Sequence, residues 1–485
     1  MDRRKFIQLS LLASGAAFAA PRSLAASTDP LRLTLRPDRP GNTISEDFTG
    51  FSYETAQLHN PYFFTAENSQ LVGFYRRLSP SGVLRIGGNT SAFSVWTPNP
   101  GAEDVAESLR DEVAGPDTGK HAAPRRAVTP LAIDNLRRFV DATGWRLIYG
   151  LNLGGGSPET AADEAEYVAK AMGPKLVAFQ FCNEPDLFYK NGLRTKDYDF
   201  DQFAVEWQRV FEAVRGRAPG VPLAGPDTAF NNEWLVPFAR RFKSDVLFLT
   251  QHYYAEGPPD DPSMTIERLL NPDLKLEEEF NGMARTRRDT GLPFRMAETN
   301  SCWGGGKAAV SDTFASALWG ADLMYRLAAA GGTGINFHSG GYGWYTPVAG
   351  APTKGFLARP LYYGMLLFAE AGAGTLVAAE IDKAAAPLLN AYGLSASGAL
   401  KAVILNKHAD RDVTLTIDPG TRAASASVIR LQAPRLNDTA DTTLGGAPVG
   451  AGGDWSPAVT EKIAARKGKV TLQIPKASGA LVTFS

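Results

Sequence analysis

KLVAFQFC (residues 175–182), followed at once by Asn183-Glu184-Pro185, is the stretch that decides the fold. The run is short, apolar and bounded by polar residues, which is typical of a strand buried on both faces. Amphipathic segments with apolar residues three and four positions apart lie on either side of it, at 159–172 and 200–217. A buried strand between two helical segments predicts a parallel sheet made of strand, helix, strand units.

The same rhythm continues from residue 48 to residue 338. Eight strands with helical connections across about 300 residues predict a (β/α)₈ TIM barrel. A helix start is expected at Ser311 and Asp312. The expected strands are 48–54, 82–88, 145–152, 175–182, 221–227, 246–254, 293–299 and 333–339, and the clearest helices are 131–143, 159–172, 200–217 and 311–330.

After about residue 365 the sequence changes to short β-like runs separated by Gly, Pro and Asp, at 400–406, 412–417, 425–432 and 469–474. This pattern predicts an appended antiparallel β-sandwich domain. The early run LRLTLRP (31–37) is expected to add a strand to it. We therefore expect an N-terminal strand segment at 27–47, a catalytic barrel at 48–365 and a C-terminal β-sandwich at 366–485.

Residues 1–26 have the features of a signal peptide: a basic MDRRKF start, an apolar run and a segment of small residues. Arg3 and Arg4 favour the twin-arginine export route, so a periplasmic or extracellular location is expected. No later segment has the eighteen or so continuous apolar residues of a membrane span, and we expect no membrane insertion. The 50 basic and 51 acidic residues nearly balance, which argues against nucleic acid as a partner.

The chain has only two cysteines, Cys182 and Cys302, so it is not a disulfide-stapled scaffold. Both lie close in sequence to glutamates of interest, and a thiol nucleophile has to be considered. No histidine is near either cysteine in sequence, so we favour the interpretation that both side chains only pack in the hydrophobic core. The histidines show no spacing typical of a zinc site, so no metal and no other cofactor is expected.

Two glutamates lie where barrel enzymes carry their reacting groups, at the C-terminal ends of strands. Glu184 follows the fourth expected strand and Glu298 ends the seventh. An unpartnered carboxylate is costly in such apolar surroundings. Glycoside hydrolysis needs two carboxyl groups flanking one bond, about 5 Å apart in retaining enzymes, and the fourth and seventh strands face each other across a barrel. The pair therefore predicts a retaining glycosidase.

The motif Asn183-Glu184-Pro185 together with Glu298 resembles the clan A retaining glycosidases. Within that clan, LRIGGNTSAF (84–93), TQHYY (250–254) and ETNSCWGGGKAAVSDTFASALW (298–319) resemble glycoside hydrolase family 79, the β-glucuronidases and heparanases. The resemblance covers the barrel and the appended domain.

The family pattern implies that Glu184 is the general acid/base and Glu298 the nucleophile. Asn183 is then expected to bind the sugar 2-hydroxyl, and Asn89 to contribute to the sugar site. Arg85 is expected near Glu298 at the barrel floor, where its charge would keep that carboxylate ionised.

The resemblance also implies a site for a sugar carboxylate. The matching positions are Tyr254, Tyr345 and the backbone of Gly304 and Gly305, which lets an anion approach closely. Trp303 stands where several relatives have tyrosine, so one hydroxyl donor is missing here. The expected substrate is a glucuronate-containing oligo- or polysaccharide, cleaved as an exo-β-glucuronidase cleaves it.

Three alternatives stay open at this stage: an endo-acting, heparanase-like enzyme, which would need a cleft lined with Lys and Arg; another clan A activity such as a glucosidase or xylosidase; and a non-catalytic carbohydrate-binding protein. Trp96, Trp303 and Trp344 are expected as sugar-stacking platforms. Trp145, Trp207 and Trp319 are expected in the core. The polar stretch 102–126 is expected to shape the cleft or to be a surface insert.

Overall fold

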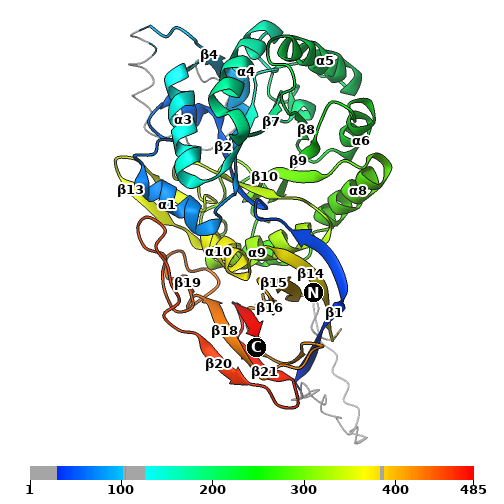
Figure 1. Cartoon of the computed structure of the whole chain (residues 1–485), viewed down its shortest axis with the longest axis vertical. Helices are drawn as coiled ribbons and strands as arrows, with labels where there is room; N and C mark the ends of the chain where they lie inside the picture. The colour runs from blue at the N-terminus through cyan, green and yellow to red at the C-terminus, as the bar shows by residue number, and fades with distance from the viewer. Residues whose placement is uncertain (1–29, 102–103, 105–125, 383–386) are drawn as a thin grey trace, which may run out of the picture.

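The computed structural model describes residues 30–101, 104, 126–382 and 387–485. These residues form two parts, a barrel in the upper half of Figure 1 and a β-domain below it. The expected signal peptide and nearly all of the 102–126 stretch lie outside the described residues.

The upper part is a ring of eight parallel strands. Hydrogen bonds join them in the order β7-β6-β3-β2-β11-β10-β9-β8, and a parallel bridge between Phe179 and Leu223 connects the two ends. The predicted barrel is confirmed, with every strand at its expected place. The strands are β2 (Thr49–Glu54), β3 (Val83–Gly87), β6 (Arg146–Gly150), β7 (Leu176–Gln180), β8 (Ala224–Thr228), β9 (Phe248–Glu256), β10 (Phe294–Cys302) and β11 (Ile335–Ser339).

Helices surround this ring, and local sequence explains where several of them begin. Thr129 and Ser157 each cap a helix that starts with proline, and Asp199 forms a capping box with Gln202. The helices are α1 (Ser69–Leu78), α3 (Pro130–Thr143), α4 (Pro158–Met172), α5 (Phe200–Arg217), α6 (Asn232–Arg241), α7 (Ile266–Leu270), α8 (Leu274–Thr290), α9 (Phe314–Ala329) and α10 (Pro360–Ala371).

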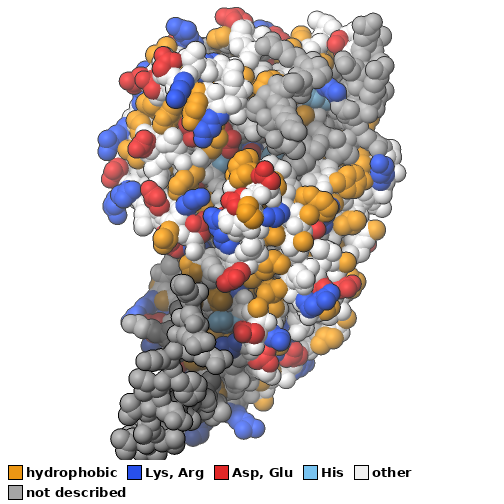
Figure 2. Space-filling view, turned by 180° about the vertical axis from the view of Figure 1, so that it is seen from behind, with side chains coloured by type: hydrophobic (Ala, Val, Ile, Leu, Met, Phe, Trp, Pro, Cys, Tyr) orange, Lys and Arg blue, Asp and Glu red, His pale blue; other side chains and the backbone are white. Residues whose placement is uncertain are grey.

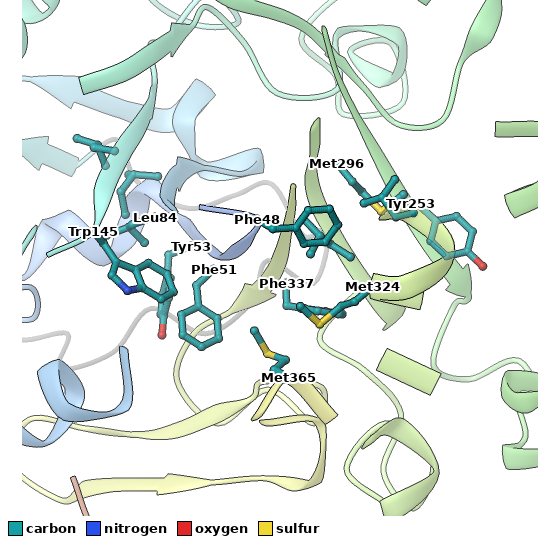
Figure 3. Close-up of a cluster of buried hydrophobic side chains, with 14 of the residues drawn as sticks. Phe48, Phe51, Tyr53, Leu84, Trp145, Tyr253, Met296, Met324, Phe337 and Met365 are labelled. Atoms are coloured by element: carbon teal, nitrogen blue, oxygen red, sulfur yellow. The ribbon is translucent and has the colours of Figure 1, made fainter. Parts of the chain in front are cut away.

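The barrel strands pack on these helices through one large hydrophobic cluster. Figure 3 shows Phe51 of β2 close to Met365 of α10, and Phe337 of β11 close to Met324 of α9. Trp145, Trp207 and Trp319 are buried in the same cluster, as expected from their positions in strand and helix patterns. Burial of this many large side chains is the main force that closes the ring.

The lower part is a sheet of ten mostly antiparallel strands that encloses a second hydrophobic core. β1 lies between β14, to which it is antiparallel, and β17, to which it is parallel, so the N-terminal run belongs to this sheet. Helix α10 extends across the boundary expected at residue 365 and ends at Ala371. The strands are β1 (Leu31–Ile44), β14 (Gly374–Ile381), β15 (Leu389–Ala396), β16 (Ala399–Asn406), β17 (Val413–Asp418), β18 (Ser425–Gln432), β19 (Thr443–Leu444), β20 (Glu461–Ala464), β21 (Val470–Ile474) and β22 (Ser478–Phe484).

The two parts meet at α9, and this contact corrects one expectation. The helix begins at Phe314, after Thr313, and not at Ser311 or Asp312. The amides of Phe314 and Ala315 donate to the carbonyl groups of Asp438 and Leu436 in the β-domain. Partners from the other domain therefore satisfy the amides that a local cap would otherwise have to bind.

Charges of both signs are interspersed on the face of the molecule that Figure 2 displays. This agrees with the near balance of acidic and basic residues in the sequence. Among the residues that the structure describes, no helix is both long and apolar enough to cross a membrane.

A buried ion pair joins the two parts, and its loss should destabilise the protein. Lys407 Nζ lies 2.9 Å from Asp322 of α9, and both side chains are almost inaccessible. We expect Lys407→Met to lower the free energy of unfolding by about 3 kcal/mol, because Asp322 stays buried without its cation. Urea denaturation measures the loss. The double variant Lys407→Met/Asp322→Leu should recover part of the lost free energy of unfolding. An equal loss in the single and the double variant would contradict this interpretation.

Candidate active site

Polar side chains converge at the C-terminal mouth of the barrel, at the ends of seven of its eight strands. They are Glu54 on β2, Arg85 on β3, Glu184 after β7, Asp227 on β8, His252 and Tyr254 on β9, Glu298 on β10 and His338 on β11. All but Tyr254 are buried, and Tyr254 is nearly so. So many polar groups are tolerated there because they pair with one another.

Irregular backbone aims two of the acids into the site. Glu184 and Asp227 both adopt left-handed conformations, with φ of 47° and 65°. The amide of Glu184 donates to the carbonyl oxygen of Asp227 at 2.8 Å, which ties the ends of β7 and β8 together. Non-glycine residues in this conformation are strained, and such strain concentrates at functional sites.

A bulge on β10 aims Glu298. The pairing register between β10 and β9 shifts between Met296 and Glu298, so Glu298 lies opposite His252. Met296 packs into the hydrophobic cluster beside Tyr253 (Figure 3), although it is only two positions away from Glu298. In a regular strand both side chains would point to the same face, and the bulge lets one face the helices and the other the mouth.

The two expected carboxyl groups lie close together. One carboxylate oxygen of Glu184 and one of Glu298 are within 4.8 Å of each other, and a ring nitrogen of His252 is within the same distance of both. This spacing suits retaining enzymes, whose carboxyl groups are about 5 Å apart, and is shorter than the roughly 6.5 to 9.5 Å of inverting enzymes.

The surroundings of Glu298 favour its ionised form. Burial opposes ionisation, but the positive charges of His338, His252 and Arg85 outweigh it and hold the pKa of Glu298 well below its usual value. Arg85 lies 2.5 Å from one carboxylate oxygen, and the Tyr254 hydroxyl donates to the other at 2.8 Å. These charges therefore favour the ionised carboxylate of Glu298 at the barrel mouth.

Glu184 has a different partner. His252 places Nδ1 3.0 Å from Glu184 and Nε2 3.1 Å from Asp227. Burial lowers the pKa of His252. The nearby charges of Asp227 and Glu298 raise it by more than burial lowers it, so the pKa of His252 lies well above its usual value. The result is a row of Asp227, an imidazolium ring and Glu184.

Arg85 connects the other polar groups of the site. It is fully buried, and its guanidinium group donates to five side-chain acceptors, which are Gln180, Ser52, Glu298, Asn183 and Asp227. The expected position beside Glu298 is where the structure has it. Because all five of its donors are engaged, Arg85 orients the other groups and has none left for a sugar.

Asn183 and Asn89 lie together, as the sequence suggested. Asn183 accepts a hydrogen bond from Arg85 at 2.8 Å and donates to Asn89 Oδ1 at 3.0 Å. The side-chain amide of Asn183 carries two hydrogens and can donate twice. Asn183 directly precedes Glu184 in the chain.

Sequence reasoning missed a second histidine and a third acid. His338 lies 3.4 Å from Glu298 and 3.5 Å from Glu54, and Glu54 accepts hydrogen bonds from the amide and hydroxyl of Thr90. Asp227 was also missed, and His252 was expected only as a wall residue. Each of these residues lies at or near the C-terminal end of an expected strand, and that position was the available signal.

The four positions expected to bind a sugar carboxylate are partly brought together. Tyr345 is 2% exposed, and its ring lies 6.3 Å from that of Tyr254. Gly304 and Gly305 have positive φ, and Trp344 donates its amide to the carbonyl of Gly305 at 2.7 Å. Tyr254, however, donates its single hydroxyl hydrogen to Glu298, so that hydrogen is already engaged.

Of the three tryptophans expected to stack on sugars, the prediction for Trp96 is wrong. Its ring is buried, donates to Asp163 and packs on Tyr167, because Trp96 ends β4 (Ser94–Trp96), which lies beside α4. Trp303 and Trp344 are each about half exposed.

Neither cysteine is placed for thiol chemistry. Both are buried and unpaired, and burial raises the pKa of Cys302 to about 12. Glu184, His252 and Glu298 are close enough together to be considered as ligands for a metal ion. A protonated imidazole between two carboxylates has no lone pair to offer, so these residues are better suited to proton transfer.

A barrel with two facing glutamates at its mouth and an appended β-domain defines the class of the barrel glycoside hydrolases. Two family models match this chain: the N-terminal domain of glycosyl hydrolase family 79 over residues 128–324, and the C-terminal beta domain of the same family over residues 391–481. The chain belongs to glycoside hydrolase family 79.

Individual relatives agree with this placement. A β-glucuronidase of Neurospora crassa is 23% identical over 70% of this chain and 66% of its own length, and a heparanase of Bos taurus is 24% identical over 62% of each. The chain thus spans less than two thirds of either relative. The solved structure of a 4-O-α-L-rhamnosyl-β-D-glucuronidase from Fusarium oxysporum 12S shares the fold, with a TM-score of 0.73 and 17% identity over 93% of this chain and all of that one.

Proposed function

We propose that this family 79 glycosidase is a retaining exo-β-glucuronidase, in which Glu298 attacks the anomeric carbon and Glu184 protonates the departing oxygen. The observation that carries the mechanism is the pair of carboxylate oxygens within 4.8 Å of each other. The names of the fungal relatives, both β-glucuronidases, support a glucuronide as the substrate.

The roles of the two glutamates follow from their partners. A nucleophile must be ionised, and Glu298 is held so by the cations around it. An acid/base must exchange a proton during each half of the reaction, and Glu184 has His252 3.0 Å away. Attack by Glu298 forms a glycosyl ester as the leaving group takes the Glu184 proton, and Glu184 then removes a proton from the water that hydrolyses the ester.

The proposed carboxylate site is the turn at 304–306 beside Tyr345. Its three glycines have φ between 74° and 94°, a conformation that keeps side chains away and lets an anion reach the backbone amides. Tyr345 adds a buried hydroxyl group. Backbone amides and a hydroxyl group can bind a uronate without a cluster of Lys and Arg side chains.

A side-by-side assay of nitrophenyl β-glucuronide, glucoside, xyloside and arabinoside tests the function. We expect kcat/KM to be highest for the glucuronide. A preference for the glucoside or xyloside would assign the chain another glycosidase activity. Inactivity on all four, and on natural glucuronides, would favour a carbohydrate-binding protein.

Tyr345→Phe tests the carboxylate site. A hydrogen bond to a charged group is worth roughly 1.5 to 3 kcal/mol, so kcat/KM for the glucuronide should fall by about one to two powers of ten. The low rate on the glucoside should barely change. Tyr325→Phe removes a hydroxyl buried in α9 and is the matched control. Equal losses on both substrates would mean that Tyr345 is only a wall of the site.

The pH profile should respond to His338. This histidine lies 3.4 Å from Glu298 and is among the charges that hold its pKa low. Without that charge the pKa of Glu298 rises, so its carboxylate becomes protonated at a less acid pH. We expect His338→Asn to move the acid limb of kcat/KM up by about one pH unit. His408→Asn, in the β-domain, is the control, and an acid limb that stays in place would contradict this role of His338.

A further inference from the structure

Three large aromatic side chains remain exposed beside the site, although most others in the barrel are buried. Trp303 is 48% exposed, Tyr342 49% and Trp344 47%. Trp303 belongs to the turn after β10, and Tyr342 and Trp344 belong to the loop after β11. We call these three residues the aromatic wall.

The wall is built from the same turns as the proposed carboxylate site. Trp303 directly precedes Gly304, and Trp344 directly precedes Tyr345. The hydrogen bond from the Trp344 amide to the Gly305 carbonyl joins the two loops. Trp303 and Trp344 therefore flank the proposed carboxylate site on the two loops that form it.

The fold holds these rings firmly while leaving part of each accessible. The Trp303 ring lies against Gly257, where even a Cβ atom would overlap the indole. The Arg359 guanidinium lies 5.8 Å from the centre of the Trp344 ring and donates to the carbonyl of Gly343 at 2.7 Å. Rigid aromatic rings are good contact surfaces, because little conformational entropy is lost when a ligand packs on them.

Exposed aromatic clusters of this kind are costly in water and mark binding surfaces. A pyranose presents one face of C–H groups, which packs on an aromatic ring while its hydroxyl groups stay solvated. Glu184 and Glu298 are buried, so the sugar they act on must be enclosed, and the group attached to it must extend outward past the rim.

We infer that Trp303, Tyr342 and Trp344 form a subsite for a sugar residue of the leaving group. The inference rests on the proposed glucuronidase function and narrows its substrate class to glucuronosyl glycans. Alkyl glucuronides, which place no ring on the wall, are then poor substrates of the same catalytic pair.

The test compares methyl β-glucuronide with a disaccharide in which β-glucuronate is linked to galactose, by chromatographic detection of released glucuronate. For the unmodified enzyme we expect kcat/KM to be at least about tenfold higher on the disaccharide. Trp303→Ala and Trp344→Ala should each lower kcat/KM much more on the disaccharide than on methyl glucuronide and so remove most of this advantage. Trp303→Phe and Trp344→Phe, which keep a ring, should retain much of it.

Tyr62→Ala is the matched control, because Tyr62 is equally exposed (49%) but lies in the loop after β2. It should change neither rate. Equal activity of the unmodified enzyme on both glucuronides would overturn the subsite and leave the glucuronidase function intact. So would alanine variants that lose activity equally on both substrates. Failure to hydrolyse either glucuronide would instead overturn the proposed function on which the subsite rests.

Discussion

Glu298→Ala should lower kcat for every β-glycoside that the enzyme accepts by at least about four powers of ten. The change removes the carboxylate that forms the glycosyl ester, and no other carboxylate replaces it on that face of the sugar. A leaving group that needs no protonation should not restore the rate, because the lost step is the attack itself. Steady-state hydrolysis of nitrophenyl β-glucuronide measures the effect.

Loss of Glu298 also leaves Arg85 and His338 without their shared anion, so folding must be checked separately. Glu298→Gln keeps the size and one hydrogen-bond acceptor, and it should melt cooperatively while remaining equally inactive. Added azide can attack from the vacated face of Glu298→Ala and should give the α-glucuronosyl azide. Residual turnover within a hundredfold of the unmodified enzyme would show that Glu298 is not the nucleophile.

The barrel could be predicted from the sequence because its strands are buried on both faces. KLVAFQFC at 175–182 contains β7, and each of the other seven apolar runs overlaps one of the other seven strands. Such runs form strands whatever their neighbours are, since apolar burial decides them locally.

The start of α9 could not be predicted, because its first amides are satisfied from far away. Ser311 and Asp312 look like a helix start, yet the carbonyl groups of Leu436 and Asp438 bind the amides at 314 and 315. More than a hundred positions separate these partners along the chain. The contact exists only after the β-domain has docked on the barrel.

The same limit applies to the site. Glu184 and Glu298 could be found because each ends an apolar strand in a recognisable motif. His252 and Asp227 also lie at or near the ends of expected strands, but their importance comes from a contact between neighbouring strands at the barrel mouth, which the sequence does not show. Trp96 misled because an exposed and a buried tryptophan in a loop look alike in sequence; its hydrogen bond to Asp163 on α4 decides the matter.

The row of Asp227, His252 and Glu184 gives the acid/base a suitable partner in both of its protonation states. When Glu184 is protonated, His252 still has the carboxylate of Asp227 3.1 Å away. When Glu184 is ionised, the imidazolium ring stabilises its charge at 3.0 Å. Glu184 can therefore change its protonation state without leaving a buried charge unpaired.

Glu184→Ala should accordingly have an effect that depends on the leaving group. Hydrolysis of a glucuronide with a poor leaving group, such as an alkyl or sugar aglycone, should fall by about three powers of ten or more, because nothing protonates the departing oxygen. Formation of the glycosyl ester from dinitrophenyl β-glucuronide should be nearly unchanged, since that phenolate leaves unassisted. Its steady-state rate should be limited by slow hydrolysis of the ester and preceded by a burst of dinitrophenol.

Azide then distinguishes the two glutamates. In Glu184→Ala it needs no general base, so it should attack the glycosyl ester of Glu298 and accelerate turnover. Two inversions at the anomeric carbon give the β-glucuronosyl azide, which nuclear magnetic resonance distinguishes from the α product by the anomeric coupling constant. Asp186→Asn, a change of a neighbouring, partly buried acid that accepts a hydrogen bond from the Ala229 amide, should give no azide product. An α-azide from Glu184→Ala would mean that the two glutamates have the opposite roles, with Glu184 as the nucleophile and Glu298 as the acid/base.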